Sequence, residues 1–205
     1  NYKRHDIIKM EKATFAVFLL CFAFICMVIA FATPYWVESF AKSGNQFVKC
    51  GLWEFCFNDY IFYKDYNSKR FLGCFYIFDS KIRNLWEWLS PPWFVACEVM
   101  AGVSLLFQFL TLVVASIAYW RCLPPYFKKV VYQAAMGVCM GVVALILITL
   151  IVYGVGKEYR SWMPRPDQNY LSWGYGLFAI SGIITLFAGV AFLVASKTDI
   201  EKDLY

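Results

Sequence analysis

The sequence predicts a membrane protein with four transmembrane helices and a small β-sheet. Three observations favour this fold class. Hydrophobic residues make up 61% of the 205-residue chain and the mean hydropathy is +0.56, both above the values typical of soluble domains. Four apolar runs are each long enough to cross a bilayer, which takes about 20 residues. The loop between the first two runs holds 15 Phe, Trp or Tyr residues, too many for a disordered tether.

The four apolar runs are joined by one long loop and two short connections. The expected layout is spans at about 13–35, 93–120, 130–156 and 170–196, loops at 38–90 and 157–169, a turn at 121–129 and a tail at 197–205. We see no internal repeat or low-complexity linker, so we predict a single four-span domain over residues 1–205.

The second span contains two polar residues that need an explanation. Glu98 lies within about two turns of the expected outer boundary, where its carboxylate is expected to reach headgroups or water. Gln108 lies deeper, and we expect it to hydrogen-bond a neighbouring helix.

The first apolar run also resembles a signal peptide, because Ala30-Phe31-Ala32 fits a small-residue cleavage site. Its length exceeds the roughly 7–15 residues of a signal h-region. Tyr35 and Trp36 follow it where an interfacial aromatic belt falls. We therefore interpret the run as a retained span.

Basic residues predict the orientation of the chain. They crowd the first twelve residues and the turn between the second and third spans: Lys3, Arg4, Lys9, Lys12, Arg121, Lys128 and Lys129. The positive-inside rule then places both termini in the cytoplasm and the loops at 38–90 and 157–169 outside. The net charge of +5 is explained by anchoring to the lipid bilayer and indicates no nucleic-acid partner.

The long loop carries strand patterns. Trp53, Phe55 and Phe57 alternate with Glu54 and Cys56, which is the period of two that a strand requires. The segment "CFYIF" at 74–78 is similarly rich in strand formers. We predict a small antiparallel sheet at the outer end of the helices.

Three of the eight cysteines lie in this loop, namely Cys50, Cys56 and Cys74. An outer loop faces an oxidising compartment, where disulfides persist. Because three is odd, one thiol is free or pairs between chains.

The motif residues in and before this loop resemble the signature of the claudin superfamily. Trp36 follows the first span, "GLWEFC" occupies 51–56, and Cys74 comes later. The superfamily also contains the peripheral-myelin and lens-fibre proteins and the glutamate-receptor regulatory subunits. Its layout of four spans, a large first outer loop, a short second one and cytoplasmic ends is similar to the layout expected here.

The resemblance implies a fold, a disulfide and a function. The fold is a left-handed four-helix bundle capped by an antiparallel sheet from both outer loops. Trp36, Gly51, Leu52 and Trp53 are the signature residues, and Cys56 and Cys74 form the disulfide. The implied function is that of a cell-junction protein in the lateral plasma membrane, associating with claudin-like copies in the same and in neighbouring membranes to form a paracellular barrier or adhesion strand at a septate or tight junction.

Two features depart from vertebrate claudins. Seventeen residues separate Cys56 from Cys74, a longer spacing than in the proteins it resembles, and Cys50 is an additional cysteine that competes as a partner for Cys74. They indicate a divergent, invertebrate relative, so the positions of pore-lining residues do not transfer.

Two sets of residues are candidate contacts. Intermolecular contacts are expected from apolar residues at loop tips, namely Ile61, Phe62, Tyr63, Trp162 and Met163. Helix packing, within the chain or between copies, is expected at Gly137, Gly141, Gly182 and Gly189. The C-terminal "EKDLY" is a candidate strand for a cytoplasmic scaffold.

The sequence carries no catalytic constellation. Its one histidine is His5 in the basic tail, and no cluster has metal-ligand spacing, so we predict no enzyme activity, cofactor or metal. The alternative function, also on this scaffold, is an auxiliary subunit that regulates an ion channel or receptor.

Overall fold

The structure is a computed structural model, and it describes residues 2–40, 46–62, 69–120 and 124–200. Helical residues 2–11, 125–126 and 198–200 are described by their backbone alone. The chain divides into two compact units. Unit 1 comprises residues 1–27, 103–147 and 180–205, and unit 2 comprises residues 28–102 and 148–179. All four long helices contribute residues to both units, and the prediction of a single domain stays a prediction.

Four helices are long and apolar enough to cross a membrane, as the sequence predicts. They are α1 (Tyr2–Ala32), α3 (Pro92–Tyr119), α4 (Pro125–Gly156) and α5 (Trp173–Ile200). Their apolar windows cover Lys12–Ala32, Pro92–Tyr119, Phe127–Gly156 and Trp173–Lys197. The chain is therefore a membrane protein with four candidate spans.

Unit 1 consists of helix segments packed through small residues. Its core is rich in alanine: Ala13, Ala16, Ala115, Ala118, Ala135, Ala188 and Ala195 are all buried. Small side chains let helix backbones approach closely in lipid, where no hydrophobic force drives them together. The larger Tyr132 and Phe192 rings stack at 5.8 Å and fill the space left between alanines.

A buried polar network crosses unit 1. The Gln108 side-chain amide of α3 donates to Thr185 Oγ1 at 2.6 Å and to Ser181 Oγ at 3.3 Å, both on α5. Ser181 Oγ in turn donates to the carbonyl of Ala23 on α1 at 2.9 Å. The prediction that Gln108 bonds a neighbouring helix is confirmed. Because lipid offers no competing water, this network specifies which helix faces meet.

The four candidate packing glycines fall into two pairs. A Cβ atom added to Gly182 would lie 2.9 Å from Ile146 Cγ2, and one added to Gly189 would lie 3.1 Å from Cys139 Cβ. Both glycines of α5 therefore sit against α4 within unit 1. Gly137 and Gly141 of α4 are exposed, and an added Cβ would meet no atom within 4 Å in the described structure.

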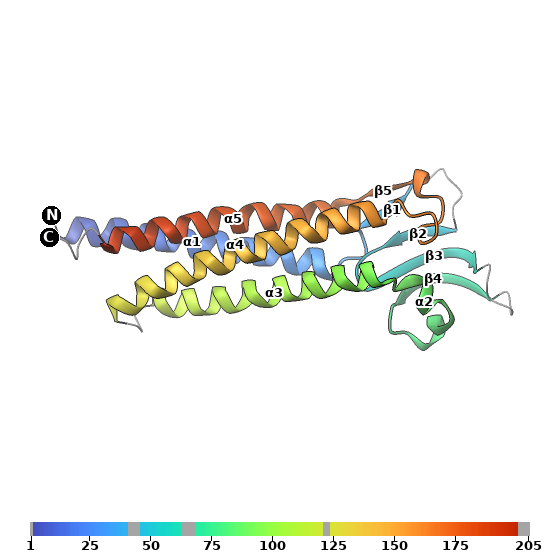
Figure 1. The fold of residues 1–205 in the computed structure, drawn as a ribbon, viewed down its shortest axis with the longest axis horizontal. Coiled ribbons are helices and arrows are strands. Elements are labelled where there is room, and N and C mark those ends of the chain that lie inside the picture. The colour runs from blue at the N-terminus through green and yellow to red at the C-terminus, as the bar shows by residue number, and fades with distance from the viewer. Residues whose placement is uncertain (1, 41–45, 63–68, 121–123, 201–205) are drawn as a thin grey trace. The chain divides into compact units, whose positions relative to one another are not determined.

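Unit 2 contains a five-stranded antiparallel sheet in the order β4-β3-β2-β1-β5 (Figure 1). The strands are β1 (Val37–Ser39), β2 (Phe47–Cys50), β3 (Glu54–Ile61), β4 (Arg70–Tyr76) and β5 (Asn169–Leu171). The first four belong to the first loop and β5 to the second, so both predicted outer loops build one sheet. Residues 54–57 of the strand predicted at 53–57 form the start of β3, and the strand predicted at 74–78 ends at Tyr76.

Three short elements lie outside the predicted pattern. They are the 3-10 helices η1 (Ser80–Leu85) and η2 (Pro166–Gln168) and the short helix α2 (Trp86–Leu89). The fourth span also begins later than expected, at Trp173, because residues 169–171 pair with β1 as strand β5. Hydropathy alone does not distinguish a three-residue apolar strand from the start of an apolar helix.

The two classes of glycine predict different effects of a larger side chain. Gly182→Val is expected to lower the free energy of unfolding by about 1–3 kcal/mol, because its methyl groups would overlap Ile146. Gly141→Val is the matched control, since the space around Gly141 is open. Denaturation of the purified protein in a mild detergent measures both. Equal losses in the two variants would contradict the assignment of Gly182 to the packed face.

Candidate functional site

Trp36 anchors the sheet of unit 2. Its side chain is fully buried, and the indole Nε1 donates to the carbonyl of Ala30 in the last turns of α1 at 2.7 Å. The ring packs against Tyr153 at 4.8 Å and Phe178 at 5.0 Å between centroids. A buried indole requires a hydrogen-bond partner, and here that requirement fixes the direction in which the chain leaves the helix.

The "GLW" residues hold the turn from β2 into β3. A Cβ atom on Gly51 would lie 2.3 Å from the Thr33 carbonyl oxygen, so only glycine fits where the chain crosses the segment after α1. Leu52 is fully buried. The Trp53 ring contacts Phe31 of α1 at 5.1 Å, edge to face. Gly51 and Trp53 therefore tie the turn to the end of α1.

A disulfide links the two strands at one edge of the sheet. Cys56 of β3 and Cys74 of β4 lie directly opposite one another in the antiparallel register and are bonded. The bridge closes the hairpin whose tip is the insertion between them. Glu54 lies close to both sulfurs, but sulfurs already joined in a disulfide are not thiolate ligands for a metal.

Cys50 is a free thiol in the same loop as the disulfide. It is fully buried, and its Sγ lies 3.5 Å from the Tyr153 hydroxyl. Burial raises the pKa of the Cys50 thiol to about 12, and the hydrogen bond to Tyr153 opposes this only in part. The open alternatives for the three loop cysteines therefore resolve into one disulfide and one inert, buried thiol.

An exposed apolar surface follows the edge strand of the sheet. On β4, the side chain of Leu72 is 70% exposed and that of Tyr76 is 63% exposed, and Phe78 just beyond the strand is 73% exposed. We call Leu72, Tyr76 and Phe78 the β4 surface. Since β4 is the first strand in the sheet order, this surface adjoins an edge whose backbone is unpaired within the described structure.

The comparison with family models matches this architecture. Residues 21–194, most of the chain, match the model described as PMP-22/EMP/MP20/Claudin tight junction. The chain belongs to this family. No curated protein matches the sequence. The family is one of structural membrane proteins rather than enzymes, and the anchor, turn and disulfide described above lie within the matched range.

Two of the predicted contact residues of this claudin-family chain are not exposed. Trp162 and Met163 are 5% and 2% exposed, so the expectation that they form an exposed loop tip is wrong. The indole Nε1 of Trp162 donates to the Leu89 carbonyl at 3.2 Å, and its ring meets Trp93 edge to face at 4.8 Å. Trp162 thus attaches the second loop to the end of α2 (Trp86–Leu89) and the start of α3, and Met163 is buried next to it in the sequence.

The three contact residues expected at the tip of the hairpin between β3 and β4 have different outcomes. Ile61, the last residue of β3, is 37% exposed and stays a candidate contact. Phe62 is buried, with its ring 5.4 Å from that of Trp88, so it is not available to a partner. Tyr63 lies outside the described residues.

Glu98 is buried rather than extended toward headgroups. Its side chain is 8% exposed, and Oε1 has no hydrogen-bond partner among the described residues. The expectation that it reaches water is therefore wrong, because α3 turns this position toward the interior of unit 2.

Charged residues of the insertion are partly paired. Arg70 and Asp59 form an ion pair at 2.6 Å, and Lys69 donates to the Lys81 carbonyl at 3.1 Å. Both ion-pair side chains are more than half exposed, so the pair contributes little to stability.

The disulfide predicts a measurable loss of stability. The double variant Cys56→Ala/Cys74→Ala is expected to lower the free energy of unfolding of the sheet by about 3 kcal/mol, because the unfolded loop regains its freedom. Limited proteolysis of the purified protein measures this as faster cleavage between β3 and β4. Cys21→Ala, in a half-buried position of α1, is the control. Unchanged cleavage in the double variant would contradict the structural role.

The buried Cys50 thiol is expected to stay unreactive toward alkylating reagents from pH 7 to 9. With the pKa at about 12, roughly one thiol in ten thousand is ionised at pH 8, and that fraction grows only as pH rises further. We expect iodoacetamide to leave Cys50 unmodified in the folded protein from pH 7 to 9, and to modify it after unfolding in dodecyl sulfate. Peptide mass spectrometry measures the extent. Equal rates in both states would show that the thiol is accessible.

Proposed function

We propose that this chain is a cell-junction protein of the lateral plasma membrane. Its sheet binds claudin-like copies in the same and in neighbouring membranes, and the assembled copies form a paracellular barrier or adhesion strand. The observation that carries the proposal is the β4 surface, held on a sheet that a disulfide and an aromatic anchor make rigid. The family assignment supports it, because the matching model includes tight-junction proteins.

The β4 surface has the properties of a protein-binding edge. Contiguous exposed apolar residues are uncommon on protein surfaces that bind nothing. An unpaired edge strand also offers backbone groups that a strand of another chain can pair with. The Cys56–Cys74 bridge holds β4 against β3. Binding at this edge therefore does not carry the conformational-entropy cost of ordering a loose loop.

A second surface supports association within one membrane. Gly137 and Gly141 are exposed on α4, with open space where a side chain would be. Ala134 and Ala144 are exposed on the same helix and extend the small-residue stripe. Two such stripes can approach closely in lipid.

The proposed orientation places both termini in the cytoplasm. Basic residues at the starts of α1 and α4 favour that side. The sheet then faces the space between cells, and the C-terminal "EKDLY" faces a cytoplasmic scaffold.

The proposal is tested by expression of the full chain in cells that lack junctions. We expect cell aggregation and strands at contacts. Leu72→Asn/Tyr76→Asn is expected to weaken aggregation about fivefold or more per side chain, the effect of truncating a central contact residue. Phe40→Asn is the matched control, because Phe40 is 53% exposed but lies near β1 at the opposite side of the sheet order.

Two results would overturn the junction proposal. One is an absence of aggregation and strands by the unmodified chain at normal surface levels. The other is equal aggregation by the unmodified chain and the β4-surface variant. An effect seen only when an ion channel or receptor is co-expressed would favour the auxiliary-subunit function.

A further inference from the structure

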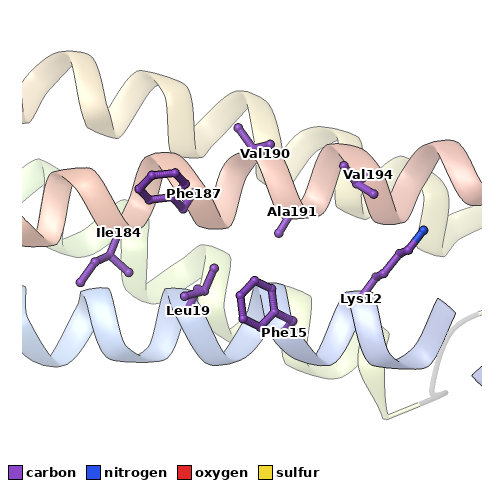
Figure 2. Close-up of a pocket in the computed structure, with 8 residues that line it drawn as sticks. All are labelled: Lys12, Phe15, Leu19, Ile184, Phe187, Val190, Ala191 and Val194. Carbon is purple, nitrogen blue, oxygen red and sulfur yellow. The ribbon is translucent and has the colours of Figure 1, made fainter. Parts of the chain in front are cut away.

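A groove in unit 1 lies between α1 and α5. It is a cavity of about 410 Å³, lined by three residues of α1 and five of α5. Figure 2 shows Lys12 and Val194 at one end of the groove and Ile184 at the other, with Phe15 and Leu19 projecting from α1 toward α5. Seven of the eight lining residues are apolar, and Lys12 carries the one charge.

The groove opens toward lipid. Phe15 and Phe187 at its rim are 58% and 59% exposed, and both belong to candidate membrane spans. The solvent around them is therefore hydrocarbon. An empty apolar groove forfeits dispersion contacts, so a flexible apolar chain that fills it is favoured.

The length of the groove matches one leaflet. Ten residues of α5 separate Ile184 from Val194, and at 1.5 Å per residue they span about 15 Å. The hydrocarbon core of a bilayer is about 30 Å thick, so the groove covers about half of it. Lys12 is the last charged residue before the uncharged run at 13–37, which places the charged end of the groove at the boundary of the apolar part of α1.

Lys12 gives the charged end of the groove a preference for anions. It is half-buried and forms no ion pair with a described residue. The helix positions three and four residues away hold Lys9, Ile8, Phe15 and Ala16, none of them acidic. Lys128, Lys129 and Lys197 also belong to unit 1. The acidic residues of unit 1 are Asp6, Glu11, Asp199, Glu201 and Asp203, all at positions whose side chains the structure does not describe. An ammonium group at a membrane boundary that has no carboxylate partner among the described side chains favours an anion.

We propose that this groove binds one acyl chain of an anionic phospholipid, with the lipid headgroup at Lys12. The lipid belongs to the leaflet on the side of the chain termini. A transmembrane helix of a second copy fits less well, because helix association in lipid favours small residues and Phe15 and Phe187 project at this groove.

The test is native mass spectrometry of the full chain, purified in a mild detergent and titrated with phosphatidylserine or phosphatidylcholine of the same acyl chains. We expect Lys12→Gln to reduce phosphatidylserine binding about fivefold, which corresponds to about 1 kcal/mol for one lysine at a membrane surface, and to leave phosphatidylcholine binding unchanged. Ala191→Phe, which fills the groove, is expected to reduce binding of both lipids.

Matched controls lie outside the groove. Lys128→Gln removes a charge from the first turn of α4, and Val114→Phe adds the same ring to an exposed position of α3. We expect neither to change lipid binding. Equal effects of Lys12→Gln and Lys128→Gln would overturn the proposal in favour of diffuse attraction. Unchanged lipid binding in Ala191→Phe, with loss of a dimer signal, would instead assign the groove to a second copy. Circular dichroism confirms that each variant is folded.

Discussion

The structure of unit 2 depends on the hydrogen bond from the Trp36 indole to the Ala30 carbonyl. The backbone of the same residue joins two further segments: its N–H donates to the Cys50 carbonyl at 3.0 Å, and its carbonyl accepts from Ser172 at 2.8 Å. One residue thus connects the end of α1, strand β2 and the start of α5. Leaving a buried indole N–H unpaired costs about 1–3 kcal/mol, so alternative paths for the chain out of α1 are disfavoured.

This constraint separates the large apolar residues of the loops into two groups with different physical roles. Trp36, Phe55 and Trp162 are buried and hold the sheet to helix ends through ring contacts. Leu72 and Tyr76 are exposed on a strand that the first group keeps in place. The aromatic richness of the first loop therefore serves stability first, and only a minority of its apolar side chains remains for a partner.

Sequence patterns predicted the features that depend on local periodicity and composition. The four spans follow from the length of apolar runs, and the first half of β3 follows from the alternation at residues 53–57. The Cys56–Cys74 pairing came from resemblance to a family, since spacing alone left Cys50 open. Burial of Trp162 was not predictable, because it depends on Leu89, which lies 73 residues away in the sequence.

The exposed surface was missed for a related reason. Alternation along "RFLGCFY" places Leu72 and Tyr76 on one face of a strand, but it does not say which face is covered. That information lies in what packs on the sheet, where Phe71 is buried on one face while Leu72 and Tyr76 are exposed on the other. Gly137 and Gly141 show the same limit, because the spacing that marks a packing helix does not identify the helix that packs.

The sheet order also has a consequence for biosynthesis. Strand β1 pairs with β2 from its own loop and with β5, which the ribosome makes much later. At roughly 5–20 residues per second, the interval between Cys50 and Asn169 is on the order of ten seconds. During that time the first loop contains strands β1 to β4 and its cysteines, but β5, which pairs with β1, has not yet been synthesised. Chaperones of the secretory pathway therefore encounter a sheet that lacks β5. In a chain that ends before Asn169, the edge of β1 that pairs with β5 stays unpaired.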